Sequence, residues 1–201
     1  HPVYPQLVYG GNRLVPMPAA LRWSAHAGGG DYGTTVGHES ALVVVTEAEG
    51  GQAWVRECWF EGGGDTTRFN GMKSELSQRY GVRQWAFDPN ERYAANSAGA
   101  VAVAMGKGTR EARVGRVRAR LNAHTLLFDM NGAGVEALYN EVRRQSYRVR
   151  EDGQLELRRV EDNRTAALEN AIDLLDGTQR LEVPPAARSE YGRRPRAVGR
   201  V

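Results

Sequence analysis

The chain has 201 residues, of which 41% are hydrophobic and 25% are charged, a composition typical of one globular domain. It carries 27 basic and 24 acidic residues, and its single cysteine, Cys58, excludes an internal disulfide framework and fits a reducing compartment. No apolar run reaches the ~18 residues of a membrane span and no signal segment opens the chain, so we expect a soluble protein.

The two ends of the chain differ in composition from its middle. Residues 1–20 begin with His1 instead of Met and are rich in proline, so we expect an irregular lead, cut from a longer protein. Residues 181–201 are rich in arginine and are expected to form a basic, flexible tail. A single folded domain is therefore predicted over residues 21–180.

The first part of this domain predicts an antiparallel meander of three strands. The first strand ends at Asp31, and the next two are Leu42–Thr46 and Ala53–Phe60. The glycines before Asp31, Gly28–Gly30, allow a sharp turn and a close approach of the backbone to a ligand. Asp31 is therefore a candidate ligand, and an Asx-turn, in which its side chain caps its own backbone, is the alternative.

A helix and a short strand follow the meander. Apolar residues recur at helical spacing from Phe69 to Tyr80, and Gly81 marks the end of the helix. The apolar run Gln84–Phe87 is predicted to be a strand that stops before Pro89, because proline cannot continue a hydrogen-bonded ladder. Asp88, between them, is thus a second carboxylate at a strand end, and opening a turn is its alternative role.

A basic helix is predicted over residues 109–121. Its apolar stripe is formed by Val114, Val117 and Leu121. Three basic side chains fall on a neighbouring face of the helix, namely Arg113, Arg116 and Arg120. This face either is solvated or contacts the phosphates of a nucleic acid.

The last third of the domain alternates strand and helix. A strand over His124–Phe128 precedes a helix marked by apolar residues from Val135 to Val142. Residues 148–160 predict a hairpin about Asp152-Gly153, which carries four arginines, Arg148, Arg150, Arg158 and Arg159. A last helix starts near Asp162, which is either its N-cap or a third candidate ligand. A meander followed by this alternation predicts an α/β fold, a mixed sheet with helices on its faces.

Three acids therefore stand at the ends of elements: Asp31, Asp88 and Asp162. If the first and fourth strands are neighbours, Asp31 and Asp88 project from the same edge of the sheet. Clustered carboxylates repel one another unless cations neutralise them, and oxygen ligands favour Mg²⁺ or Mn²⁺. Two such ions ~3.5 to 4 Å apart activate water and stabilise the leaving oxygen in phosphodiester hydrolysis. The acids thus predict a two-metal phosphodiesterase.

Four segments in order resemble the landmarks of the nuclease domain of tailed-phage terminase large subunits. They are Asp31–Thr35, Phe87–Asn90, Ala104–Gly108 and Glu161–Leu168. The resemblance implies a ribonuclease H-like fold and a two-metal endonuclease that cuts concatemeric viral DNA during genome packaging, in the cytoplasm of the infected bacterium. It also implies partners: double-stranded DNA, an ATPase domain, a small terminase subunit and a portal protein.

The same resemblance assigns roles to residues. The metal ligands fall on Asp31, Asp88 and Asp162. Where many members have a second Asp after the third ligand position, this chain has Ala166, so Glu169 and Asp173 are candidate substitutes on the same helix face. DNA contacts are expected from Lys107 and from the arginines of the basic helix and the hairpin.

Two other functions stay open. Asp31–Thr35 and Phe128–Gly134 also resemble the first and second phosphate loops of the actin and heat-shock chaperone ATPases, which would imply a nucleotide-binding lobe. Alternatively, the basic segments hold DNA without cutting it, as a non-catalytic binding module. The variant Asp31→Asn separates nuclease from binding module, because it should abolish cleavage and leave DNA affinity equal or higher.

Overall fold

A mixed seven-stranded sheet organises the computed structural model, which describes residues 1–33, 38–62, 64–89, 91, 99–103, 108–157 and 162–177. The strand order is β1-β7-β4-β3-β2-β5-β6. The central meander consists of β2 (Trp23–Asp31), β3 (Glu39–Ala48) and β4 (Ala53–Gly62), paired antiparallel. The predicted meander is therefore confirmed.

Parallel strands extend the meander on both sides. On one side β5 (Trp85–Phe87) pairs with β2, and β6 (Ala100–Ala102) pairs with β5. On the other side β7 (Leu126–Asp129) pairs with β4, and β1 (Leu14–Val15) pairs with β7. The sheet is mixed, as predicted.

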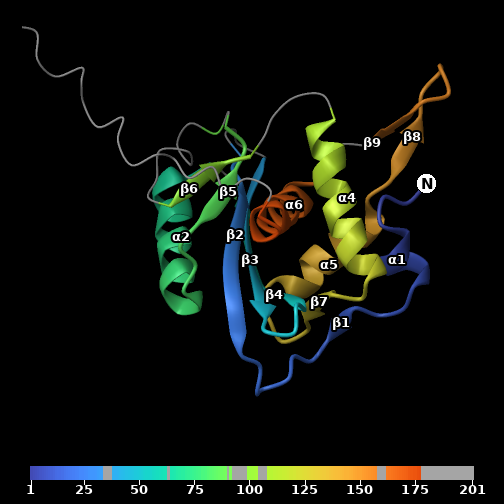
Figure 1. The fold of residues 1–201 in the computed structure, drawn as a ribbon. Helices are drawn as coiled ribbons and strands as arrows, with labels where there is room; N and C mark the ends of the chain where they lie inside the picture. The colour runs from blue at the N-terminus through green and yellow to red at the C-terminus, as the bar shows by residue number, and fades with distance from the viewer. Residues whose placement is uncertain are drawn as a thin grey trace, which may run out of the picture.

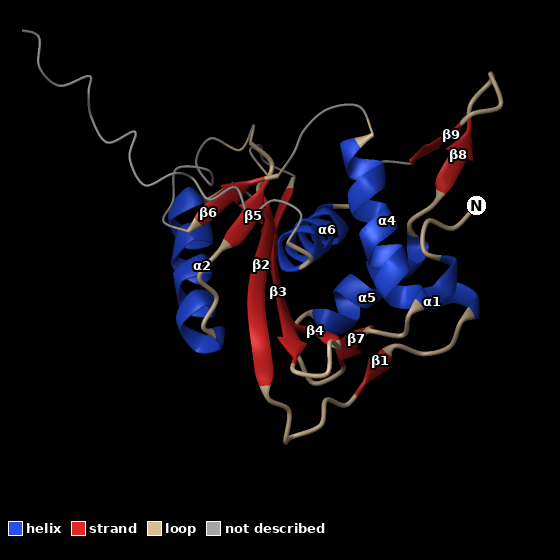
Figure 2. Ribbon diagram, in the orientation of Figure 1, coloured by secondary structure: helices blue, strands red, loops and turns tan. Residues whose placement is uncertain are grey.

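Helices cover both faces of the sheet (Figures 1 and 2). One face carries α2 (Thr66–Tyr80), and the other carries α4 (Thr109–Asn122), α5 (Val135–Arg144) and α6 (Asn163–Leu175), with α1 (Pro5–Tyr9) packed against α4 and α5. The hairpin of β8 (Tyr147–Val149) and β9 (Leu155–Leu157) forms a separate small sheet. No helix within the described ranges is long and apolar enough to cross a membrane.

Strand β3 contributes to two apolar cores because successive side chains of a strand point to opposite faces. Val43 and Val45 belong to the core under α4, α5 and α6, whereas Leu42 and Val44 belong to the core under α2. Burial on both faces explains why this strand is a continuous apolar run in the sequence.

Helix α2 ends at Gly81, as predicted, and begins after Asp65, a capping residue that the sequence analysis did not identify. The Asp65 side chain accepts hydrogen bonds from the backbone N–H groups of Thr67 and Arg68, at 2.9 and 3.1 Å. Gly81 ends the helix with a left-handed φ of 70°.

The first twenty residues are not an irregular lead. They contain α1 and β1, and the side chains of Val3, Tyr4 and Leu7 are buried in the main core. The folded unit therefore begins before residue 21. We did not predict these elements because they depend on distant partners: β1 pairs with β7, which lies more than a hundred residues away in the sequence.

The glycines before Asp31 pack the fold and do not form a turn. Gly28–Gly30 lie inside β2. A Cβ atom on Gly29 would stand 1.9 Å from the carbonyl oxygen of Ala167 in α6, and Cβ atoms on its two neighbours would meet aromatic rings of β5. The sequence predicted a turn at these glycines and a close approach of their backbone to a ligand. In the structure their backbone instead approaches a helix and aromatic side chains of the protein itself. Asn170 of α6 completes the contact by donating a hydrogen bond to the Gly30 carbonyl at 3.0 Å.

Candidate functional site

Asp31 and Asp88 lie at the carboxyl ends of two adjacent parallel strands. Gly29 of β2 pairs with Ala86 of β5, so two further residues along the same register place Asp31 opposite Asp88. The adjacency of these strands, on which the sequence prediction depended, is confirmed. Both carboxyl groups therefore belong to one edge of the sheet.

A fourth acid, which the sequence analysis missed, contacts Asp31. Glu91 follows Asp88 in a turn closed by a hydrogen bond from the Glu91 N–H to the Asp88 carbonyl, at 3.0 Å. Its side chain is only 7% exposed and lies beside the Asp31 carboxylate. Burial, and then the negative charge of Asp31, raise the pKa of Glu91 well above its usual value.

Asp162, at the start of α6, adds a negative charge to the same group of acids. Burial is the largest cause that raises the pKa of Asp31, and the negative charges of Asp162 and Asp88 raise it further. Asp162 occupies the N-cap position of α6, yet its side chain makes no capping hydrogen bond. Instead it forms an ion pair with Arg110, whose Nη1 lies 2.7 Å from Asp162 Oδ2. The capping role that the sequence offered as an alternative is therefore not observed.

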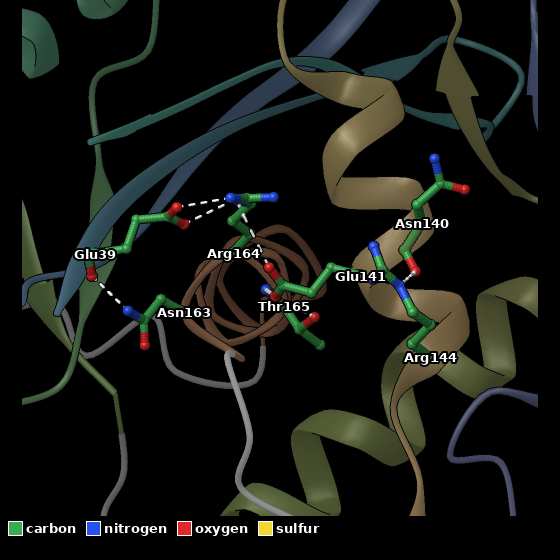
Figure 3. Close-up of polar contacts among 7 residues, drawn as sticks. All are labelled: Glu39, Asn140, Glu141, Arg144, Asn163, Arg164 and Thr165. Carbon is green, nitrogen blue, oxygen red and sulfur yellow. Dashed lines mark hydrogen bonds and ion pairs between the residues drawn. The ribbon is translucent and has the colours of Figure 1, made fainter. Parts of the chain in front are cut away.

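A residue of another helix caps α6 in place of Asp162. The carboxylate of Glu141 in α5 accepts hydrogen bonds from both the backbone N–H and the hydroxyl of Thr165, each at 2.8 Å (Figure 3). These groups belong to the first turn of the helix, whose N–H groups lack partners within it. The Asp162 carboxylate is consequently left to pair with Arg110.

The first turn of α6 is also tied to the central sheet. The Arg164 guanidinium donates two hydrogen bonds to the carboxylate of Glu39 in β3, at 2.8 and 2.6 Å (Figure 3). Its carbon atom Cζ lies 3.6 Å from the centre of the Phe60 ring in β4. Asn163 donates to the Glu39 backbone carbonyl (Figure 3). Together with the Glu141 cap, these contacts fix the backbone next to Asp162.

The two candidate substitutes for the third ligand have partners inside the protein. Glu169 is 2% exposed and accepts hydrogen bonds from the Tyr4 hydroxyl and from Arg110 Nε. Asp173 forms an ion pair with Arg116. Of the three acids, Asp162 is the one whose negative charge contributes to the raised pKa of Asp31.

The basic face of α4 turns towards acids of the protein and is not a solvated face. Arg116 pairs with Asp173, and Arg120 bonds Glu47 at 2.6 Å and Asp176 at 2.7 Å. Arg113 is 8% exposed. The predicted phosphate contacts of these three arginines stay predictions, but Arg116 and Arg120 already have anionic partners.

The arginines of the hairpin are more accessible. The side chain of Arg148 is 65% exposed and pairs with Glu156 at 2.8 Å, and that of Arg150 is 54% exposed. The hairpin turns at Gly153, whose φ is 78°, as the Asp-Gly pair predicted. Three further predicted DNA contacts and the predicted tail lie outside the described residues, namely Lys107, Arg158, Arg159 and residues 181–201.

The chemistry of this site suits a hard divalent cation. All four acidic groups offer carboxylate oxygens, and Glu91 Oε2 is buried with no hydrogen-bond partner within the described ranges. Among the same residues, no group of three or more His, Cys, Asp or Glu side chains is arranged to hold an ion. Mg²⁺ is commonly bound by one or two carboxylates together with water and substrate phosphates, so a ready-made cage is not required.

Comparison with known proteins identifies the fold. No protein-family model and no curated protein sequence matches the chain. Among solved structures, it is similar to the large terminase nuclease from thermophilic phage G20c with bound magnesium, with a TM-score of 0.64 and 15% identity over 86% of this chain and 96% of that one. It is also similar to the nuclease domain of the g2p large terminase from bacteriophage SPP1 with bound Mn, with a TM-score of 0.61 and 14% identity over 81% and 96% of the two chains.

A longer protein shares the same fold. The large terminase of bacteriophage HK97 matches with a TM-score of 0.64 and 13% identity over 87% of this chain. The match covers 43% of that terminase, so the chain spans less than half its length. The chain therefore has the ribonuclease H-like fold of the nuclease domains of phage large terminases.

Proposed function

We propose that this chain is a metal-dependent endonuclease domain that hydrolyses phosphodiester bonds of double-stranded DNA during phage genome packaging. The observation that carries the proposal is the position of Asp31 and Asp88 at the ends of adjacent parallel strands, with Asp162 acting on Asp31 from α6. Proteins with this fold include terminase nucleases with bound magnesium and Mn, which supports the same chemistry here.

Asp31, Asp88 and Asp162 would hold two Mg²⁺ or Mn²⁺ ions, and Glu91 would contribute a further oxygen next to Asp31. Without cations these acids repel one another; burial first, and then the negative charges of Asp162 and Asp88, raise the pKa of Asp31. Bound ions would lower the pKa of the attacking water and offset the charge of the transition state. The residues of the protein position the carboxylates: β2 and β5 set the spacing of two acids, and the capped first turn of α6 sets the third.

The substrate would be held through its phosphates. The exposed side chains of Arg148 and Arg150 are suited to contact a DNA backbone, so binding should weaken steeply as salt rises. Lys107, Arg158 and Arg159 are further proposed contacts. An ATPase domain, a small terminase subunit and a portal protein would direct the domain to concatemeric viral DNA in the host cytoplasm.

A plasmid-nicking assay tests the proposal. The wild-type chain should nick supercoiled plasmid in Mn²⁺ or Mg²⁺ and not in chelator, and Asp31→Asn and Asp88→Asn should each reduce nicking by more than about 100-fold. DNA affinity of both variants should equal or exceed that of the wild type. Glu49→Gln is the matched control, since Glu49 is exposed beyond the end of β3 that lies away from Asp31.

Two outcomes would overturn this proposal. A wild-type chain that binds DNA but cuts none with any cation would be a non-catalytic binding module. Undiminished nicking by Asp31→Asn would show that the cleavage arises elsewhere.

A further inference from the structure

Arg110 joins the candidate ligand Asp162 to the buried carboxylate of Glu169, which we call the anchor. It lies in the first turn of α4, with its Nη1 atom 2.7 Å from Asp162 Oδ2. Its Nε atom donates a hydrogen bond to Glu169 Oε2 at 3.0 Å. The guanidinium therefore spans two carboxylates of α6, one at the site and one in the core.

The anchor is held firmly. Glu169 is 2% exposed, and its second oxygen accepts a hydrogen bond from the hydroxyl of Tyr4, itself 1% exposed, at 2.8 Å. A buried carboxylate is stable only with its charge paired and its oxygens hydrogen-bonded. Arg110 supplies that charge, so swinging it away from Glu169 would remove the cationic hydrogen-bond partner of a buried carboxylate. The position of the guanidinium is thus fixed from the core side.

Asp162 needs such support. It stands at the start of a helix without capping it, and it faces the negative charges of the other acids. An arginine presents its donors in a rigid planar fork, which can hold two carboxylates at a set spacing, whereas a lysine is a flexible point charge. Resting on the proposed nuclease function, we infer that Arg110 is a positioning residue, which holds Asp162 in place for cation binding and acts through it.

Loss of Arg110 has two effects on cation binding, and they have opposite signs. Removing a positive charge near the acids strengthens their attraction for a cation. Releasing Asp162 from its anchor weakens cation binding, because the ligand must be ordered when the ion arrives. Positioning contacts of this kind change metal affinity by about 10- to 100-fold. We expect the positional effect to dominate.

The test is a titration of the full chain with Mn²⁺ alone, in which electron paramagnetic resonance measures the concentration of free ion at each step. Arg110→Gln should weaken Mn²⁺ binding by about 10-fold or more, and Arg110→Lys, which keeps the charge and loses the fork, should also weaken it. Arg118→Gln is the matched control, because Arg118 belongs to the same helix but donates its Nε hydrogen bond to the Val3 carbonyl, at 2.6 Å, and not to an acid of α6.

A double variant asks whether Arg110 works through Asp162. In an Asp162→Asn background, Arg110→Gln should cause no further loss of Mn²⁺ affinity. Thermal melts identify any variant that is unfolded. If Arg110→Gln is unfolded, Arg110→Lys decides whether Arg110 positions Asp162, because a lysine keeps a positive charge beside the buried Glu169.

The outcomes separate this inference from the nuclease proposal. Tighter or unchanged Mn²⁺ binding by folded Arg110→Gln or Arg110→Lys would overturn the positioning role alone. An equal loss in the Asp162→Asn background would overturn it too. A wild-type chain that neither binds Mn²⁺ nor cuts DNA would overturn the nuclease function, and with it the role of Arg110.

Discussion

Glu141 in α5 accepts the backbone N–H of Thr165 at 2.8 Å and so caps a helix to which it does not belong. Helix N-termini are usually capped by the residue that precedes them. Here that residue is Asp162, and the cap from α5 leaves its carboxylate to the group of acids at the edge of the sheet. The acid that caps the helix and the candidate metal ligand are thus two different residues.

This division predicts the stability of cap variants. Glu141→Ala should lower the free energy of unfolding by about 1 to 3 kcal/mol, because the N–H and the hydroxyl of Thr165 lose a charged acceptor. Glu136→Ala, an exposed glutamate of the same helix, should change it by less than about 0.5 kcal/mol. Urea denaturation of both variants measures the difference. Equal losses would show that the cap contributes no stability.

Two glycines predict opposite effects of an added methyl group. Gly29→Ala should destabilise the fold by about 3 kcal/mol, because its Cβ would collide with the backbone of α6. Gly115→Ala, inside α4 with nothing within 4 Å of the new Cβ, should raise the unfolding free energy by about 0.5 to 1 kcal/mol. Urea midpoints compare the two, and a neutral Gly29→Ala would contradict the packing seen between β2 and α6.

The acids at the sheet edge predict a conflict between stability and function. Without divalent cations, Asp31→Asn should raise the unfolding free energy by about 0.5 to 2 kcal/mol, because it removes a buried negative charge and, with it, the repulsion from Asp162 and Asp88. Adding Mn²⁺ should raise the melting temperature of the wild type more than that of the variant, because binding stabilises the folded state by mass action. Thermal melts in chelator and in Mn²⁺ test both statements. A variant that Mn²⁺ stabilises as much as the wild type would remove Asp31 from the ligand set.

The internal ion pairs of α4 predict that Arg120 supports the fold more than it supports DNA binding. Arg120→Gln breaks bonds to Glu47 and Asp176 and should cost about 1 to 3 kcal/mol of unfolding free energy. DNA affinity, measured by fluorescence anisotropy at two salt concentrations, should change less than about twofold. Arg148→Gln is the comparison: it should weaken DNA binding and lower the salt dependence, since its side chain is exposed. A large loss of DNA affinity in Arg120→Gln would restore the predicted phosphate contact.

The half-buried His26 of β2 predicts a pH dependence of stability. Burial, and then the positive charge of Arg56, lower the pKa of His26 below its usual value of 6.5. The unfolded chain therefore binds this proton more tightly, so the stability that His26 contributes is present above pH 6.5 and is lost as the pH falls. Unfolding free energies from pH 8 to 5 should fall less in His26→Gln than in the wild type. His38→Gln, at an exposed position, is the control, and identical slopes for His26→Gln and wild type would contradict the prediction.

Much of the fold follows from local sequence patterns. The end of α2 follows from Gly81 and the hairpin turn follows from Asp152-Gly153, because each of these residues acts on its immediate neighbours. The shared edge of Asp31 and Asp88 also followed, once β2 and β5 were taken as neighbours.

What the sequence did not reveal depends on contacts between distant segments. Glu91 belongs to the site because the turn after Asp88 returns it to Asp31, and only the three-residue spacing hinted at this. The cap joins Glu141 to Thr165, 24 positions away, and the hydrogen bond that supports the anchor joins Tyr4 to Glu169, 165 positions away. No periodicity or capping rule reports such pairs.

The absence of side chains at Gly28–Gly30 in β2 has one more consequence. Since Gly29 has no side chain, α6, which begins after Asp162, packs closely against β2, the strand that ends in Asp31. We therefore expect the contact at Gly29 to influence how far apart the two acids stand. One extra methyl group would act as a wedge between them. The spacing of the acids is therefore vulnerable at a position that carries no charge and touches neither carboxylate.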